Sequence, residues 1–504
     1  MVVTVLLAVY GYNCYFLLRA ARKYRNPEHL ELDGFKPQIA VHLPIYNEKY
    51  VLPRLLRSCV QMADAYGKRQ VRIVLLDDSD DETGEEIDRL VEDYGTEGFR
   101  VEVLRRDHRD GFKAGALQTA LNSTVEDFVA VFDADFIPPR DFLLQTVPYL
   151  LNDERLGVVQ CRWGHINRNY NFITRAIAIG IDAHFLIEQP GRYAAGYFLN
   201  FNGSGGVLRR KALEEAGGWQ SDTLAEDLDA SYRMQLKGYR ILYLRGVQSL
   251  GEIPPTVPSF KRQQGRWACG SIQTAKKVLP TLLRDRSYSL IQRLQAYLHL
   301  TYYAVHPLMF CAFLLVLSAA FLNIDAISVG LTTWNALIGQ AAPTTLETTI
   351  VLIVKSLLPA LLVATIGIGA LATWIFAGAS IRMEGLSVAQ NMPSLFVLFL
   401  LGYGVSLNNT FEAGKAFFSK GERLFRRTPK YALESKKDDW AGKRYQVSLD
   451  IVALLEVAAT GAGFIAFLVA VLNSNLGLVP YLILFTSAYG LVSFLTLVQS
   501  RKEM

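Results

Sequence analysis

Two acidic side chains that follow an apolar segment are the strongest candidates for chemistry. Asp133 and Asp135 come directly after the apolar run 128–132. A carboxylate next to a buried strand is costly unless it has a partner, and two carboxylates one residue apart can direct oxygens at one hard divalent cation. Because Mg²⁺ is usually held by one or two carboxylates plus substrate phosphates, the spacing suits a nucleotide-diphosphate site with Mg²⁺ or Mn²⁺. A cap before Pro138 and Pro139 is the competing structural explanation.

A second acidic run, at 77–81, follows the apolar segment 71–76. Asp and Ser favour turns and helix caps, so a solvated turn explains this run equally well on its own. Ligands of a parallel sheet bind beyond the carboxyl ends of its strands. If both apolar segments belong to one such sheet, the two acidic runs share that edge, which favours the metal site over the cap.

Basic residues and glycines lie between and after the acidic runs. Arg109 and Lys113 stand at the start of a predicted helix, where fixed positive charge and free backbone N–H groups favour phosphate. An ordinary charged helix start is the alternative. The glycine-rich run at 202–206 is typical of a loop where backbone approaches a ligand closely.

Acidic residues also open a helix predicted to run from about 226 through Arg233. Acids in a first helical turn are stabilised by the helix dipole, which accounts for at least one of them. A carboxylate within hydrogen-bond reach of a hydroxyl can instead act as a general base. Spacing along the chain does not decide between these two roles.

The last candidate segment, Gln-Gln-Gly-Arg-Trp at 263–267, lies in a basic stretch ahead of an apolar run. Trp beside Arg is ordinary at a membrane interface. In a functional role, Arg266 would neutralise a diphosphate and Trp267 would offer an apolar face to a sugar ring.

The elements that must position these residues alternate between strand and helix from about residue 38 to 250. This alternation predicts parallel pairing and a doubly wound α/β domain. The predicted strands are 39–43, 71–76, 101–104, 128–132 and 156–159, with helices such as 85–94 and 114–122 between them.

The rest of the chain has the character of a membrane protein. Of 504 residues, 51% are hydrophobic and 20% charged, which predicts an integral membrane protein with a sizeable soluble domain. The net charge of +5 forms no single basic stripe, so no nucleic-acid partner is expected. Five cysteines without Cys-x-x-Cys spacing argue against a disulfide framework or a structural zinc site. Predicted spans lie at 2–18, 296–321, 351–379, 449–472 and 478–498.

One further apolar stretch, 387–412, precedes a loop rich in Lys and Arg at 415–444. Counting that stretch as a span would place the basic loop outside, against the positive-inside tendency. We therefore predict an interfacial helix along the inner leaflet. Five spans then leave the amino terminus outside and the basic loop inside.

Taken in order, these segments resemble the processive branch of glycosyltransferase family 2, which includes cellulose synthases, hyaluronan synthases and plant cellulose-synthase-like A mannan synthases. The resemblance covers most of the chain and includes the full Gln-x-x-Arg-Trp motif at 263–267. It implies a glycosyltransferase-A-like α/β domain, doubly wound with a mostly parallel sheet, joined to a helical membrane domain of about five spans plus interfacial helices. Asp227 corresponds to the family's catalytic base, and Asp133 and Asp135 to its metal-binding Asp-x-Asp.

The resemblance implies further site residues. Ala225 stands where the family has the Thr of its Thr-Glu-Asp motif, and Arg427 where the gating loop of cellulose synthases has Val. These departures bear on the acceptor more than on the reaction. The implied nucleotide-sugar-binding residues are Pro44, Tyr46, Glu48, Asp78, Lys113, Asp133, Gln263 and Arg266; the acceptor-binding residues are Trp267, Asn202, Gly203, Ser204 and Glu226; and the gating-loop residues are Phe425, Thr428 and Lys430.

The function implied is inverting, processive transfer of a hexose from UDP-glucose or GDP-mannose to a growing β-linked polysaccharide, with export through the membrane domain. The alternative is a non-processive lipid glycosyltransferase of the ceramide glucosyltransferase type. A transporter with a nucleotide domain is disfavoured, because the sequence has neither a P-loop pattern nor repeated membrane halves. We expect a multi-pass protein of the plasma membrane with a cytoplasmic catalytic domain, whose partners are the donor, the polysaccharide acceptor and the lipid bilayer, without an obligatory protein partner.

The expected domain order follows from these assignments. We expect an N-terminal transmembrane anchor at 1–25, a cytoplasmic glycosyltransferase domain at 26–255, interfacial helices with the Gln-x-x-Arg-Trp motif at 256–294, two transmembrane helices at 295–386, an interfacial helix at 387–413, a cytoplasmic gating-type loop at 414–447, and two transmembrane helices with a short C-terminus at 448–504.

Overall fold

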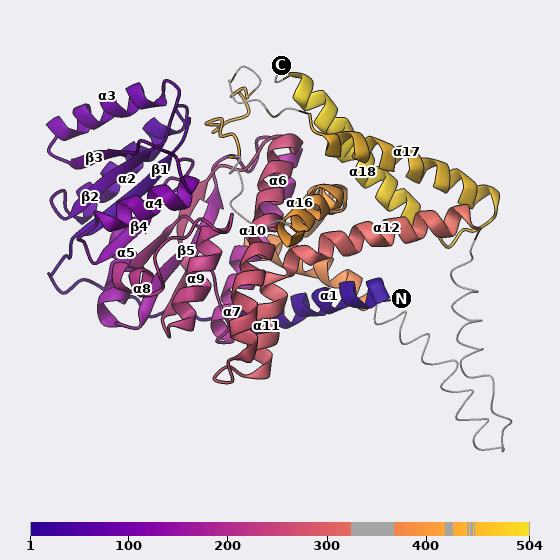
Figure 1. Ribbon diagram of the computed structural model, residues 1–504, viewed down its shortest axis with the longest axis horizontal. Coiled ribbons are helices and arrows are strands. Elements are labelled where there is room, and N and C mark those ends of the chain that lie inside the picture. Colours follow the sequence, from indigo (N-terminus) through magenta and orange to yellow (C-terminus); the bar gives the residue numbers. More distant parts are fainter. Residues whose placement is uncertain are drawn as a thin grey trace.

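The computed structural model describes residues 2–323, 367–418, 427–440 and 449–502, together with Lys443 and Val447. A domain built on a single sheet lies at one end of the molecule, and long apolar helices extend from it at the other (Figure 1).

The sheet has seven strands in the order β3-β2-β1-β4-β6-β5-β7. Its pairs are parallel except those of β6, which runs antiparallel to both β4 and β5. The predicted doubly wound, mostly parallel sheet is confirmed. The strands are β1 Ile39–Ile45, β2 Val71–Asp77, β3 Arg100–Arg105, β4 Phe128–Val131, β5 Leu156–His165, β6 Gly206–Arg209 and β7 Arg240–Gly251.

The reversed strand β6 was absent from the sequence prediction, as was β7. β6 reads Gly-Val-Leu-Arg, with only two apolar side chains against four in the equally short β4, and it follows the glycine-rich loop at once. That loop already lies at the carboxyl edge of the sheet, where the Gly205 N–H donates to the Val131 carbonyl at 3.0 Å. A strand that starts at this edge must run back across the sheet, so β6 is antiparallel.

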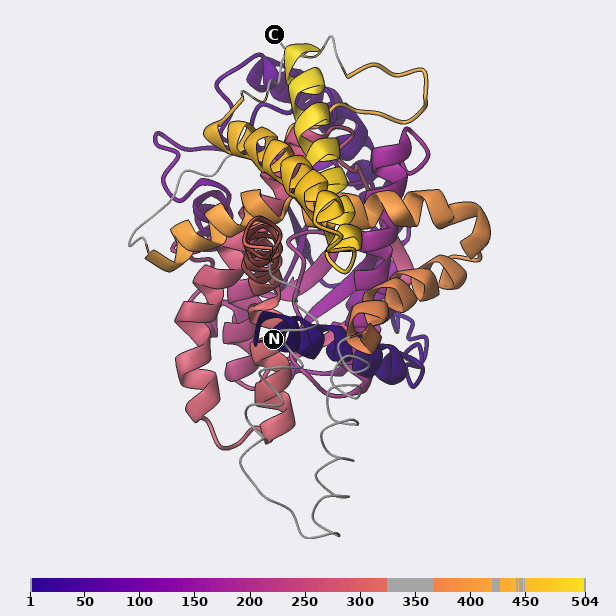
Figure 2. The same ribbon diagram turned by 90° about the vertical axis from the view of Figure 1, so that its right-hand side faces the viewer.

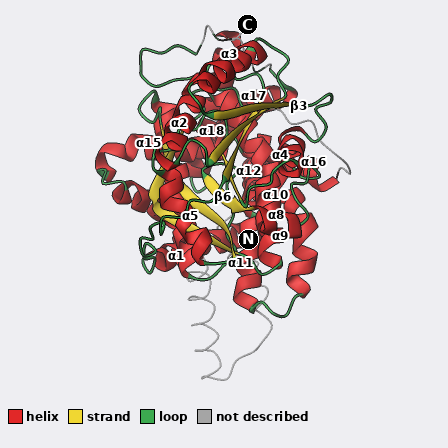
Figure 3. Cartoon of the chain, turned by 90° about the vertical axis from the view of Figure 1, so that its left-hand side faces the viewer, coloured by secondary structure: helices red, strands yellow, loops and turns green. Residues whose placement is uncertain are grey.

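Helices cover both faces of the sheet (Figure 3). Alternate residues of β1 point to opposite cores: Val41 packs in the core that includes α2 and α5, and Ala40 in the core that includes α4, α8 and α9. The helices of this domain are α2 Leu52–Tyr66, α3 Thr83–Thr96, α4 Phe112–Asn122, α5 Phe142–Asn152, α6 Phe172–Ala183, the π-helical turn η1 His184–Glu188, α7 Gln189–Ala194, α8 Arg210–Glu215 and α9 Glu226–Leu236.

The strand register brings the candidate residues to one edge. Ile45 pairs with Asp77, and His42 pairs with Val131, so the turns that follow β1, β2 and β4 are neighbours. The acidic runs at 77–81 and 133–135 therefore share the carboxyl edge of the sheet, as predicted.

Four helices in the described part of the chain are long and apolar enough to cross a membrane: Val2–Ala21, Tyr302–Phe321, Ile451–Leu472 and Val479–Ser500. Helices of this length span about 30 Å of hydrocarbon. The four match the predicted spans at 2–18, 296–321, 449–472 and 478–498. Of the predicted span 351–379, residues up to 366 lie outside the described residues, and the remainder belongs to the shorter apolar helix Gly367–Met383.

The segment predicted as one interfacial helix, 387–412, is two helices. α15 Val388–Gly404 and α16 Ser406–Phe418 meet at a bend of 43°. α15 packs on α6 and on α18 (Val479–Lys502), whereas α16 packs on α10 (Val257–Arg284). The bend lets α15 and α16 contact these different helices. The prediction of a single helix was wrong; its place along the inner leaflet stays a prediction.

The remaining helices comprise the four apolar ones and the helices α10 and α11 that precede α12 in the chain. In Figure 2, which faces the apolar helices, α17 and α18 lie side by side and α1 lies below them. These helices are α1 Val2–Ala21, α10 Val257–Arg284, α11 Leu290–Leu300, the 3₁₀ turn η2 Tyr302–Ala304, α12 Val305–Phe321, α17 Ile451–Leu472 and α18 Val479–Lys502.

Candidate active site

A pocket opens at the carboxyl edge of the sheet and collects most of the residues assigned to the donor. Its walls come from the turns after β1, β2 and β4, from α4 and α10, and from the segment that starts at Arg427. Acidic and basic side chains alternate around it, as a site for a metal and a diphosphate requires. The charged and polar lining residues are Tyr46, Glu48, Asp78, Arg109, Lys113, Asp133, Asp135, Arg266, Arg427, Thr428 and Lys430, with Pro44 beside them.

The turn after β1 is fixed to the turn after β2. Asn47, in the left-handed region at φ 56°, donates through Nδ2 to Asp80 at 2.7 Å and accepts from the Asp80 N–H at 3.0 Å. This turn places the ring of Tyr46 under the Arg109 guanidinium, 3.3 Å from the ring centroid. The stack gives the pocket a flat, cationic wall.

Asp78 is held by a forked arginine contact. Arg106 Nε and Nη2 lie 3.0 and 2.5 Å from the two carboxylate oxygens of Asp78. The Asp78 side chain is therefore fixed in one orientation in the pocket wall. Its neighbour Asp77 is buried and accepts from Arg105 at 2.8 Å, so of the two acids only Asp78 lines the pocket.

Asp133 and Asp135 each carry a lysine partner. Lys113 Nζ lies 2.6 Å from Asp133 Oδ1, and Lys430 Nζ lies 2.5 Å from Asp135 Oδ2. Hard carboxylate oxygens at this spacing fit Mg²⁺ or Mn²⁺. Among the described residues no group of three or more His, Cys, Asp or Glu side chains is gathered for a metal, so phosphate and water oxygens would complete the ligand set.

Lys113 lies between the turn that holds Asp133 and Asp135, the candidate metal turn, and the candidate base Asp227. Besides Asp133, its Nζ lies 3.2 Å from Glu226 Oε1 and 3.3 Å from the Gly203 carbonyl. Burial would lower the pKa of Lys113, but Asp133, Glu226 and Asp227 raise it well above its usual range. A permanent positive charge thus stands between the two groups of acids. Glu226, predicted to bind the acceptor, is buried and directed at this lysine.

Asp227 lies in the first turn of α9, opposite the glycine-rich loop. A Cβ built on Gly203, whose φ is 79°, would lie 2.8 Å from Asp227 Oδ2, so only glycine leaves the carboxylate room. Burial and Glu226 raise the pKa of Asp227 to about 7, although Lys113 acts in the opposite direction. A carboxylate with such a pKa accepts a proton readily near neutral pH.

Two residues of the glycine-rich loop, Ser204 and Asn202, make different contacts. Ser204 is fully buried, and its Oγ accepts from the Asp133 N–H at 3.0 Å. Ser204 therefore lies beneath the turn that holds Asp133, and its predicted contact with the acceptor stays a prediction. Asn202 is half-buried, and its N–H donates to Gln160 Oε1 at 2.8 Å.

A polar network that the sequence prediction missed contacts this loop at Asn202. His184 Nε2 lies 3.0 Å from Asn202 Oδ1, and Glu188 Oε2 lies 2.9 Å from His184 Nδ1. Arg192 donates to Glu188 Oε1 at 3.0 Å. Burial would raise the pKa of Glu188, but Arg192 and His184 hold it well below its usual range. The π-helical turn that brings these groups together has no signature in the sequence.

The Gln-x-x-Arg-Trp motif lies on α10. Thr256 caps this helix by accepting from the Ser259 N–H at 3.3 Å. Arg266 reaches the pocket, whereas Gln263 is buried and its Oε1 has no hydrogen-bond partner among the described residues. Trp267 is half-buried. Of the three, only Arg266 lines the donor pocket.

The segment 427–434 lies over the pocket. Arg427 donates to Glu48 Oε1 at 3.5 Å, and Thr428 is buried against the pocket. Burial raises the pKa of Glu48 to about 7, although Arg427 and Lys430 act to lower it. Phe425 lies outside the described residues.

A sheet of this order, with helices on both faces and an Asp-x-Asp turn at its carboxyl edge, defines a glycosyltransferase-A-like fold, and the class of protein is a glycosyltransferase. Comparison with known proteins agrees. Residues 128–377 match the family model "Glycosyl transferase family group 2". The chain therefore contains a family 2 glycosyltransferase domain, and it is mannan synthase-like in sequence.

Plant glucomannan synthases are among its similar relatives. A probable glucomannan 4-beta-mannosyltransferase of Oryza sativa subsp. japonica is 34% identical over 53% of this chain and 48% of its own length. Glucomannan 4-beta-mannosyltransferase 7 of Arabidopsis thaliana is 34% identical over 57% of this chain and 52% of its own length. The chain thus spans about half the length of the curated relatives it matches.

A solved structure shares the fold. A mannosyltransferase from Pyrobaculum calidifontis, in complex with GDP-Man and Mn²⁺, aligns with a TM-score of 0.51 at 22% identity over 74% of this chain and 98% of its own.

Proposed function

We propose that this protein transfers a hexose from a nucleotide-sugar donor to a hydroxyl of a growing β-linked glycan, with inversion at the anomeric carbon. The observation that carries the proposal is the position of Lys113. Its Nζ contacts Asp133 of the metal turn at 2.6 Å and Glu226 at 3.2 Å, and it faces the carboxylate of Asp227. The proposed metal carboxylate and the proposed base thus lie around one cation, which would also neutralise the diphosphate of the donor.

The reaction is a single displacement. Asp227 takes the proton of the acceptor hydroxyl while the oxygen of that hydroxyl bonds to the anomeric carbon. The bond between the anomeric carbon and the nucleoside diphosphate breaks in the same step. Lys113 and Arg266 stabilise the charge that develops on the leaving diphosphate. A divalent cation held by Asp133 and Asp135 would supply further charge stabilisation there.

The donor is UDP-glucose or GDP-mannose. Two observations favour GDP-mannose: the relatives named as glucomannan 4-beta-mannosyltransferases, and the similar fold solved with GDP-Man and Mn²⁺. The family 2 domain and the acids of the pocket are compatible with either donor.

We further propose that the product is a polysaccharide that leaves through the membrane helices. The segment 427–434 over the pocket and the apolar helices beside the domain support this. The basic loop at 415–444 supports a catalytic domain on the cytoplasmic side of the membrane, and the membrane that we propose is the plasma membrane. A ceramide glucosyltransferase-type enzyme, which stops after one sugar, is the alternative.

The test is to incubate the purified protein in lipid nanodiscs with labelled GDP-mannose or UDP-glucose, Mn²⁺ or Mg²⁺, and short β-glycan acceptors. We expect release of nucleoside diphosphate and a polymer that β-specific glycanases digest. A single-sugar glycolipid as the only product would refute the polymer proposal, and no transfer from any nucleotide sugar would refute the function as a whole.

A further inference from the structure

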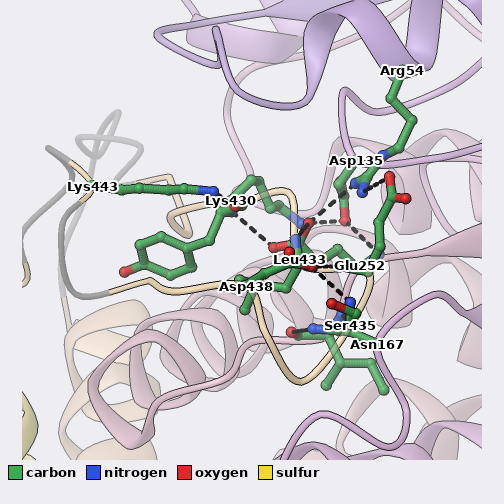
Figure 4. Close-up of polar contacts among 12 residues, drawn as sticks. Arg54, Asp135, Asn167, Glu252, Lys430, Leu433, Ser435, Asp438 and Lys443 are labelled. Atoms are coloured by element: carbon green, nitrogen blue, oxygen red, sulfur yellow. Dashed lines mark hydrogen bonds and ion pairs between the residues drawn. The ribbon is translucent and has the colours of Figure 1, made fainter.

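Glu252 is a buried acid at the edge of the donor pocket that no sequence motif singles out. It follows β7 directly, and its side chain is 1% exposed. Its own N–H lies 3.3 Å from Asp135 Oδ2, so it borders the metal turn (Figure 4). A carboxylate buried so completely needs partners, and the identity of those partners indicates its role.

Two of the partners are main-chain amides of the segment over the pocket. The Tyr431 N–H donates to Glu252 Oε1 at 2.8 Å, and the Leu433 N–H donates to Oε2 at 3.2 Å. Tyr431 and Leu433 are themselves fully buried. Glu252 therefore holds the backbone immediately after Lys430, at two points on alternate residues.

The third partner is a cation that neutralises the buried charge. Arg54 Nη2 lies 3.1 Å from Glu252 Oε2, and Arg54 Nη1 lies 3.3 Å from Glu434 Oε1, at the far end of the segment. The Arg54 side chain is 12% exposed, whereas that of Glu434 is 62% exposed. The buried half of this contact carries most of the electrostatic interaction, because exposed ion pairs are weak.

Two cations, Arg427 and Lys430, belong to the segment that Glu252 holds. Lys430 precedes the first docked amide and reaches Asp135 at 2.5 Å, while Arg427 reaches Glu48 at 3.5 Å. Both line the pocket that is proposed to take the donor diphosphate. The two amide contacts hold the backbone directly after Lys430, and so support the ion pairs that Lys430 makes with Asp135 and Arg427 with Glu48.

We propose that Glu252 is a positioning residue that docks the segment 427–434 through main-chain amides, and so presents Arg427 and Lys430 to the diphosphate of the donor. The identity of the ligand rests on the proposed function. The contact between Glu252 and the segment 427–434 does not depend on it. These contacts use main-chain N–H groups, so they hold the backbone of the segment whatever its side chains are.

The kinetic test compares Glu252→Gln with Glu434→Gln, the same chemical change on the exposed side of Arg54. We expect Glu252→Gln to raise the donor KM by about tenfold, with a smaller change in kcat, because a charged acceptor of two amides is replaced by a neutral one. Glu434→Gln should change KM by less than about twofold. Equal donor KM values for Glu252→Gln and the wild type would overturn the proposal.

A double-mutant cycle separates positioning from a general loss of structure. If Glu252 acts through Lys430, Glu252→Gln should add little to the donor KM of a Lys430→Ala variant. Full additivity of the two changes would contradict the inference. If Glu252→Gln does not fold, Glu252→Asp replaces it in this test, because it keeps the charge on a shorter side chain. We expect the donor KM of Glu252→Asp to lie between those of the wild type and Lys430→Ala.

Limited trypsin digestion tests the dock without any transfer reaction. Lys430, Lys436 and Lys437 lie in or beside the segment. We expect faster cleavage there in intact Glu252→Gln than in the wild type, and protection of the wild type by GDP or UDP with Mn²⁺. Equal cleavage rates would overturn the dock. Inactivity of the wild type with every donor, alongside faster cleavage of the variant, would refute the proposed function and leave the dock standing.

Discussion

Replacing Asp227 by Asn removes the proposed base while keeping the side chain's shape. Asp227 is outside the lining of the donor pocket, and its nearest cation is Lys113, which retains Asp133 and Glu226 as partners. Loss of one partly screened charge interaction is worth on the order of 1 kcal/mol. The donor KM should therefore change by less than about fivefold. Loss of a general base should lower kcat by roughly 10²- to 10⁴-fold.

The pH dependence gives an independent measure of the same residue. With the pKa of Asp227 raised to about 7, the base is mostly protonated at pH 6 and mostly ionised at pH 8. The wild-type kcat should be about tenfold lower at pH 6 than at pH 8. The Asp227→Asn variant should lose this dependence.

The same raised pKa has a consequence for stability. The folded protein holds the Asp227 proton more tightly than the unfolded chain, so this group's contribution to stability falls as the pH rises from about 4 to about 7. Asp227→Asn should therefore raise the Tm at pH 8 relative to the wild type, and by less at pH 5.

The assay is coupled detection of nucleoside diphosphate over pH 5.5 to 8.5, with donor binding measured by calorimetry and Tm by fluorescence. Asp222→Asn is the matched control, because the Asp222 side chain is 57% exposed and, in the described part of the chain, forms an ion pair with Lys277 alone. A kcat of Asp227→Asn within tenfold of the control would refute the base assignment.

Three further outcomes follow from the geometry. Lys113→Ala should lower kcat/KM by on the order of 10²-fold, and it should move the rise in the pH–rate profile to higher pH, since Lys113 opposes the raised pKa of Asp227; an unmoved profile would contradict this. Gly203→Ala should reduce kcat and lower the unfolding free energy by about 1–3 kcal/mol, because its φ of 79° and the 2.8 Å approach to Asp227 suit glycine alone; wild-type values from kinetics and chemical denaturation would oppose it. Removal of divalent cations with EDTA should abolish transfer, and Asp135→Asn should raise the Mn²⁺ concentration needed to restore it; full activity in EDTA would exclude the metal role.

The sequence was sufficient for the acids that follow the predicted strands β2 and β4. Apolar runs of the right length predict parallel strands, and parallel strands bring their carboxyl ends to one edge. That rule alone placed Asp133 and Asp135 near the acidic run at 77–81, and the register of β1 with β2 and β4 bears it out. The helix start at Asp227 was equally accessible, since acids favour a first helical turn.

Contacts formed by main-chain atoms could not be predicted from the sequence. Glu252 binds two backbone amides, and any residue type at 431 or 433 other than proline offers the same donor. The π-helical turn that orients His184 toward Asn202, and the bend between α15 and α16, likewise depend on packing between elements distant in sequence. The burial of Ser204 under Asp133 depends on β6, whose two apolar residues give no recognisable strand pattern.

The most direct test of the central claim is the configuration of the bond made by the purified protein. Labelled GDP-mannose or UDP-glucose, both α-linked donors, should give a β-linked product by NMR, with Mn²⁺ or Mg²⁺ present and only in samples whose Asp227 is intact. An α-linked product, or equal transfer by Asp227→Asn, would contradict the single inverting displacement at this site.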